Sequence, residues 1–190
     1  MRLLPLAAPA LLAALFATPA PVAAQTLTPV SQSLPPAALD CVRDTAPAAV
    51  RARIADSATA EDDAVFDAAQ AELVPLIAAC TTRFAVPEEK RDVYAVFGTS
   101  SVLLPELADR LRTAGLDPLI ADRASGAGPS AEPALSEEAV KAMITRVVDA
   151  YEQASPGKLD EKHAALLGLY IGNLASYWAL RSVLAKETVA

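Results

Sequence analysis

The fold is decided by one long uncharged stretch near the C-terminus, residues 164–180, with the sequence AALLGLYIGNLASYWAL. Small side chains recur every fourth residue along it, at Ala164, Gly168, Gly172 and Ser176, and therefore share one face of a helix. Glycine in a helix interior costs about 1 kcal/mol relative to alanine. Two glycines on one face therefore indicate a place where a second helix approaches closely.

Large apolar side chains fill the flanks of the same helix, so apolar groups cover nearly its whole circumference. Such a helix is the central helix of a bundle, a helix that pairs with a partner protein or a second copy, or a membrane span. We favour the bundle helix, because the stretch is only just long enough to span a bilayer and carries an asparagine near its middle. The candidate residues for helix packing or for an interface are Ala164, Gly168, Gly172, Asn173, Ser176, Tyr177 and Trp178.

Asn173 separates these alternatives. In a water-soluble core its amide must hydrogen-bond a partner, and a tyrosine hydroxyl or the backbone near a proline kink is expected. In the seam of a dimer the same side chain could set the register of the two helices.

A second amphipathic helix precedes this one. Ser136 is the expected N-cap of a helix that reaches about Ala154, and the turn formers at 155–158 connect it to the last helix, 159–187. Because short connections favour antiparallel neighbours, residues 135–187 are predicted to form a helical hairpin.

Proline and capping residues divide the earlier chain. Short helices are expected at 37–44 and 48–57, followed by a longer one from 60 to about 84. Thr59 is the expected N-cap of the longer helix, and Pro75 should kink it.

The next helix is expected to begin at Pro87 and to be bent or broken by Pro105, with Gly115 as its stop. Residues 125–133 stack turn formers and are the clearest linker in the chain. No alternating pattern is long enough to nominate a sheet. The chain is therefore predicted to be an all-α, single-domain bundle of about five helices spanning residues 35–187.

The N-terminus has the features of an export signal. Arg2 supplies a positive start, an apolar run follows, and small side chains precede Gln25. We predict a signal peptide over 1–24, a flexible tail over 25–34, and export to an oxidising compartment. The abundance of alanine and proline favours a bacterial periplasm, with secretion as the alternative.

The two cysteines, Cys41 and Cys80, are predicted to form one structural disulfide. An exported chain meets oxidising conditions, and the pair lacks the Cys-x-x-Cys spacing of redox catalysts. The alternative is two buried free thiols.

Charge and composition argue against several function classes. A net charge of −7, from 16 basic and 23 acidic residues, disfavours a nucleic-acid-binding surface. Acidic pairs fall at the expected starts of helices, where the helix dipole favours negative charge. His163 is the only histidine, and beside Asp160 it provides too few ligands for a zinc site. No catalytic constellation is recognised, and no cofactor or metal is expected.

Function is then a choice between classes. The leading hypothesis is an exported, non-enzymatic protein-interaction or structural factor, which binds a partner or a second copy through the C-terminal helix. The second is a binder of a small apolar ligand, with a pocket between the kinked helices near Pro75 and Pro105. A pocket lined by Tyr94, Phe97 and Trp178 would favour this second hypothesis. An enzyme of unrecognised type and a membrane-tethered subunit are the remaining alternatives.

Overall fold

The computed structural model describes residues 33–60, 63–128, 136–155, 157 and 159–186, which contain helices and no strand. The predicted signal peptide, 1–24, lies outside these residues. The elements are α1 (Pro36–Thr45), α2 (Ala48–Ala58), α3 (Asp63–Ala71), α4 (Val74–Arg83), the 3₁₀ turn η1 (Glu88–Lys90), α5 (Arg91–Thr113), α6 (Pro118–Ser125), α7 (Glu137–Ala154) and α8 (Glu161–Ala185). The all-α class is confirmed. Because α3 and α4 are two halves of one interrupted helix, the described residues form about seven helices, not the five predicted.

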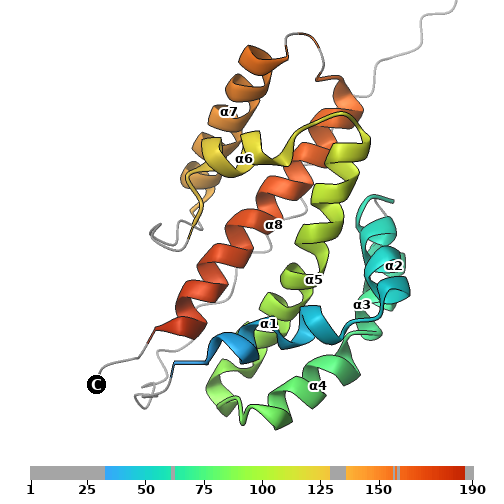
Figure 1. The fold of residues 1–190 in the computed structure, drawn as a ribbon, viewed down its shortest axis with the longest axis vertical. Coiled ribbons are helices and arrows are strands. Elements are labelled where there is room, and N and C mark those ends of the chain that lie inside the picture. Colours follow the sequence, from blue (N-terminus) through green and yellow to red (C-terminus); the bar gives the residue numbers. More distant parts are fainter. Residues whose placement is uncertain (1–32, 61–62, 129–135, 156, 158, 187–190) are drawn as a thin grey trace, which may run out of the picture.

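The centre of the molecule is the antiparallel pair α5 and α8 (Figure 1). Helices α6 and α7 lie on one side of this pair and α2 to α4 on the other, while α1 crosses the lower part of the pair in the view of Figure 1. The predicted hairpin of α7 and α8 is present, since a short connection joins the two helices and they touch. Its helices nevertheless have different main partners, because α7 packs chiefly on α6 and α8 on α5.

Helix α8 turns its large side chains toward α5. Leu167, Ile171 and Leu174 are buried, as is the ring of Tyr170, and all four lie on one face of the helix. The same helix was expected to be apolar all round, but its opposite face carries the small residues. Size of side chain therefore determines which face of α8 enters the core.

Helix α5 runs unbroken from Arg91 to Thr113 through Pro105. The sequence predicted that Pro105 would bend or break this helix, and the helix is not broken there. An interior proline costs about 3 kcal/mol, whereas burying a leucine side chain contributes about 1.5–3 kcal/mol. Leu103, Leu107 and Leu111 are all buried around the proline, so packing outweighs its local cost.

The predicted long helix is interrupted at Glu72 and Leu73, just before Pro75, where a kink was expected. The backbone there keeps a right-handed conformation, with Leu73 N donating to Gln70 O at 2.8 Å. The prediction for Thr59 is wrong. Thr59 follows the last residue of α2, and its hydroxyl donates to the Asp56 carbonyl at 2.9 Å, because the carbonyls at a helix end lack backbone donors.

Helix α6 was not among the predicted helices. It begins at Pro118, directly after Asp117, whose carboxylate accepts a hydrogen bond from the amide of Leu119 at 3.0 Å. An acidic N-cap followed by proline is a signal for a helix start that the sequence contained. Two tyrosine hydroxyls then attach α6 to the hairpin: Tyr151 donates to the Asp117 carbonyl, and Tyr170 donates to Asp122 Oδ1 at 2.6 Å.

The expected cap of α7 is present, since Ser136 Oγ accepts from the amide of Ala139 at 3.2 Å. Helix α8 begins at Glu161 and not at Leu159, so Asp160 is its N-cap, and Asp160 Oδ1 accepts from the amide of His163 at 2.8 Å. The end of the predicted flexible tail is instead fixed. Leu34 is buried, and its amide donates to the carbonyl of Leu184 at 3.0 Å, because this contact places an apolar side chain against the end of α8.

Cys41 of α1 and Cys80 of α4 form a disulfide, as predicted, with an S–S distance of 2.01 Å. Both residues are buried, and the described chain has no free cysteine. The bond fixes the end of the α3–α4 segment to α1, which in turn packs on α5.

Candidate binding groove

An open, mostly apolar depression of about 750 Å³ lies over α5, with α8 on one side and α2 to α4 on the other. Its floor comes from α5, and one edge follows the interrupted helix α3–α4. It is lined by Ser57, Ala58, Asp63, Phe66, Asp67, Gln70, Ala71, Val74, Ile77, Ala95, Val96, Thr99, Ser100, Leu103, Leu169 and Asn173.

A second depression, of about 1220 Å³, continues the first toward the start of α8, and both are lined by Ala58 and Leu169. Its other lining residues are Thr59, Arg110, Ala114, Asp160, Glu161, Lys162, His163, Ala165 and Leu166. The two depressions adjoin at the shared residues Ala58 and Leu169, and we call them together the α5 groove. Its floor extends along α5 from Ala95 to Ala114, about 28 Å at the helical rise of 1.5 Å per residue.

Apolar side chains in the α5 groove remain open to solvent. Val74 of α4 is 61% exposed and Val96 of α5 is 56% exposed, and both line the first depression. Phe66 and Ile77 are only partly buried beside them. These apolar side chains give the first depression a concave apolar surface, the form that binding sites commonly take.

Two side-chain amides line this depression, Gln70 from α3 and Asn173 from α8. The predicted partner of Asn173 is wrong, since its Nδ2 donates to the carbonyl of Leu169 in its own helix, at 2.9 Å. An amide four residues after a carbonyl can reach it along the helix, so Asn173 needs no contact with a neighbouring helix.

The rim of the α5 groove is acidic along α3. Asp63 and Asp67 are exposed and lie four residues apart, so they share one face of the helix. Among the described residues neither carboxylate has an ion-pair partner. At the far end, Arg110 pairs with Asp56, outside the lining.

Asp160 and His163 form the polar end of the groove. The backbone amide of His163 holds the pKa of the Asp160 carboxyl below its ordinary value. His163 Nδ1 lies 2.8 Å from Asp160 Oδ1, close enough for an ion pair when the imidazole is protonated. The described residues contain no group of three or more histidine, cysteine, aspartate or glutamate side chains that could hold a metal ion.

The stripe of small residues on α8 lies beside the groove and not beneath another helix of the described chain. A Cβ atom added to Gly168 or Gly172 would meet no other atom within 4 Å. Ala164 is exposed, and Ser176 is only partly buried. Each of the first three small residues directly precedes a lining residue, namely Ala165, Leu169 and Asn173.

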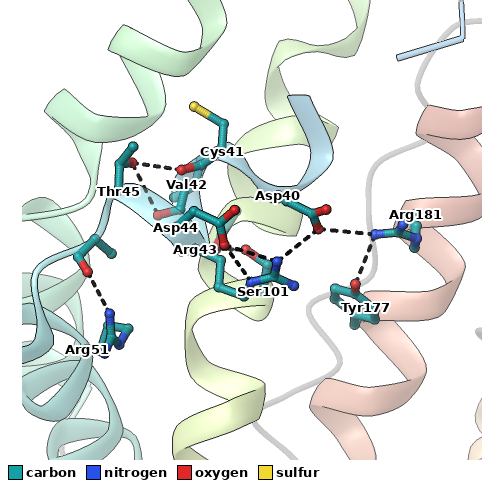
Figure 2. Close-up of polar contacts among 12 residues, drawn as sticks. Asp40, Cys41, Val42, Arg43, Asp44, Thr45, Arg51, Ser101, Tyr177 and Arg181 are labelled. Atoms are coloured by element: carbon teal, nitrogen blue, oxygen red, sulfur yellow. Dashed lines mark hydrogen bonds and ion pairs between the residues drawn. The ribbon is translucent and has the colours of Figure 1, made fainter. Parts of the chain in front are cut away.

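Tyr177 and Trp178 lie on the part of α8 that meets α5 and α1. The ring of Tyr177 stacks on Phe97 of α5 at 5.2 Å, and Trp178 meets Tyr177 edge-on at 5.2 Å. Figure 2 shows Arg181 reaching both Tyr177, whose hydroxyl accepts at 3.0 Å, and Asp40 of α1, 3.7 Å away. These two aromatic residues therefore contribute to packing within the chain.

A pocket lined by Tyr94, Phe97 and Trp178 would have favoured a small apolar ligand, but neither depression described above is lined by any of them. Tyr94 and Phe97 are fully buried in the core, and none of the three lines the α5 groove. Pro105 does not line it either, because α5 continues through that residue and opens no gap there.

One stretch of the described residues, Asp63–Arg83, is long and apolar enough to cross a membrane by length and composition alone. It is the α3–α4 segment and not α8, for which the membrane alternative was considered. Only 17% of its most apolar window is buried. An interruption at Pro75 and the disulfide at Cys80 attach this segment to the bundle, so its apolar surface forms one edge of the groove.

Most groove residues are absent from the predicted site, which comprised α8 residues only. Of that set, Asn173 alone lines the groove. Val74 is the groove residue that the sequence could have indicated. It directly precedes Pro75, and it is a large apolar residue that lies off the apolar face of residues 65–80. Val96 carried no such signal, since it follows the apolar spacing of α5.

No protein-family model, no curated protein and no solved structure matches this chain.

Proposed function

We propose that this chain is an exported, non-enzymatic protein of the bacterial envelope that binds a partner protein through the α5 groove. The observation that carries the proposal is the groove itself, an apolar channel with Val74 and Val96 more than half exposed at its floor and edge. Large exposed apolar side chains are costly in contact with water, and a partner that covers them removes that cost.

Two further observations support export. The first 24 residues have the pattern of a cleaved signal peptide. The disulfide between Cys41 and Cys80 is of the kind that persists in oxidising compartments such as the periplasm.

The test is the native mass of the protein released from its own host by osmotic shock, without detergent or reductant. We expect a cleaved chain of 166 residues, which is 190 minus 24, in a species heavier than its monomer. Val96→Asp should return it to monomer mass, because a charge in the groove opposes apolar contact. Val183→Asp is the matched control, since Val183 is 48% exposed on α8 outside the groove.

Each other result contradicts part of the proposal. A monomer for the unaltered chain argues against a stable partner. If the heavier species persists in Val96→Asp but is lost in Val183→Asp, the interface lies at the end of α8 and not in the α5 groove. Release only with detergent contradicts the soluble, exported state.

A second candidate function is the binding of a small apolar ligand, because the groove lies beside the interruption before Pro75. Titration with an apolar fluorescent dye distinguishes the two. A small-ligand binder should bind one dye molecule per monomer, and Val96→Asp should abolish this binding. A protein-binding groove about 28 Å long should instead bind the dye weakly and at several places.

A further inference from the structure

We propose that the occupant of the α5 groove is a cationic amphipathic helix supplied by a partner protein. This rests on the proposed function and names the chemistry of the partner. Three features of the groove carry it: its length, the absence of a strand edge in the described residues, and the charge of its rim.

The shape of the groove fits a helix. Its lining residues on α5 extend from Ala95 to Ala114 along one continuous helix, about 28 Å, which equals the length of a helix of about 19 residues. The part of the chain that the structure describes contains no strand, so an extended peptide would find no sheet edge to extend. An apolar channel between helices binds a helix through residues spaced three and four apart.

The walls fit the contact face of such a helix. Val74, Val96 and Leu169 offer apolar contact from three different helices. Gln70 of α3 and Asn173 of α8 also line the groove, and their amides can hydrogen-bond polar side chains at the border of an apolar stripe. One wall, α8, is lined by Ala165, Leu169 and Asn173 at intervals of four, the spacing at which a second helix interdigitates.

The rim selects positive charge. Of the ionisable side chains that line the groove, Asp63, Asp67, Asp160 and Glu161 are acidic, Arg110 and Lys162 are basic, and His163 lies beside Asp160. Arg110 is already paired with Asp56 outside the lining, and Asp63 and Asp67 have no ion-pair partner among the described residues. Lysines on a bound helix would therefore meet open carboxylates.

A second copy of this chain is a poor occupant, because each copy has a net charge of −7 and the rim is acidic. Like charges brought together at an interface oppose association. The partner is therefore a different protein with a basic helix.

The experiment uses the mature chain with its disulfide and two synthetic, fluorescently labelled helices of 18 residues. Both helices carry leucine at positions spaced three and four apart. One has lysine on the remaining face and the other has glutamate. Anisotropy titrations at low and at physiological salt measure the dissociation constants.

We expect the lysine helix to bind and the glutamate helix to bind at least about tenfold more weakly, with the difference shrinking as salt rises. Val96→Asp should weaken the lysine helix more than about tenfold. Asp63→Asn with Asp67→Asn should weaken it about three- to tenfold, the range for two exposed ion pairs. The control for total charge is Asp149→Asn with Glu138→Gln, two exposed carboxylates on α7, which should leave binding unchanged. Circular dichroism of every variant verifies that the helices are intact.

Equal affinity for the two peptides, or equal loss in the α7 control, overturns the charge selection. No binding of either peptide overturns the cationic helix as occupant. If Val96→Asp still lowers the native mass of the envelope species in that case, the proposed function stands and only the partner chemistry fails. If Val96→Asp changes neither the peptide affinity nor the native mass, both the proposed function and the proposed partner chemistry are wrong.

Discussion

Two strongly apolar helical stretches of this chain, α8 and α3–α4, differ in how far the fold buries them. Helix α8 contains the long uncharged stretch that by composition suits a membrane or an interface, yet its central large side chains, Leu167, Ile171 and Leu174, are buried in the core. The α3–α4 segment separates its apolar and polar side chains onto different faces more clearly than α8 does, yet only 17% of its most apolar window is buried. Composition alone therefore does not determine which helix enters the core.

The difference lies in how side-chain size is distributed. Helix α8 separates Leu167, Ile171 and Leu174 on one face from Gly168 and Gly172 on the other, so one face buries much area. The α3–α4 segment is rich in alanine, which buries little area whichever way it faces. Its attachment depends on a few residues, Ala69, Leu73 and Cys80, and on the disulfide.

The largest expected effect is the loss of that covalent attachment. Replacing Cys41 and Cys80 by alanine should lower the free energy of unfolding by about 4 kcal/mol, because the bond closes a loop of about 40 residues. The measurement is urea denaturation of the double variant beside the oxidised and the reduced parent. Hydrogen exchange should increase most in α3–α4, and a uniform increase across α5 and α8 would contradict the comparison.

The next effect compares matched truncations in the two helices. Ile171→Ala in α8 should cost about 2–5 kcal/mol, because the side chain is fully buried. Val74→Ala in α4 should change stability by less than about 0.5 kcal/mol, as expected for a surface site. The urea unfolding midpoints of the two variants, compared with that of the parent, measure these two stability changes. A cost at Val74 above 1 kcal/mol would mean that the valine is covered in solution by part of the same chain.

The sequence predicted the class and most helices because its strongest signals are local. Ser136 and Asp160 cap α7 and α8 through hydrogen bonds within three residues, and the cysteine pair needed only its compartment and its count. These outcomes depend little on tertiary contacts.

What the sequence could not supply are outcomes of packing between distant segments. Pro105 was expected to bend or break its helix, but three buried leucines hold α5 together. The α5 groove unites residues from five helices, and no local pattern shows that Val96 lies opposite α3 and α8. Asn173 illustrates the same limit, because a bond to its own helix is as compatible with the sequence as one to a neighbour.

High pH should open the core before the α3–α4 segment, which contains no tyrosine. Burial raises the pKa of Tyr94, which donates to the Ala38 carbonyl, to about 12. Burial also raises the pKa of Tyr151 to about 12, with nearby carboxylates adding to the shift. Because the folded pKa exceeds the unfolded value of about 10, this stability is fully present below pH 10 and is lost as pH rises toward 12.

Each of these two tyrosines should contribute about 2–3 kcal/mol to the alkaline loss, from 1.36 kcal/mol per pKa unit. Urea unfolding between pH 8 and pH 11.5 measures it. Tyr94→Phe should be less stable at pH 8 but lose less stability with rising pH. A parallel pH dependence in the parent and the variant would show that Tyr94 ionises normally in the folded chain.

The smallest effect tests the open face of α8 directly. Gly168→Ala and Gly172→Ala should each stabilise the chain by up to about 1 kcal/mol, since alanine favours the helix and the added Cβ meets no atom within 4 Å. The matched control is Gly98→Ala in α5, whose Cβ would lie 3.2 Å from Cγ2 of the buried Val42 and should destabilise the chain. Thermal unfolding at two protein concentrations measures all three. Destabilisation by the α8 substitutions, at high concentration only, would mean that a second copy covers the stripe of small residues. Destabilisation at every concentration would instead mean that a helix of the same chain packs against the stripe of small residues. The conclusion that this face of α8 is open would then be wrong.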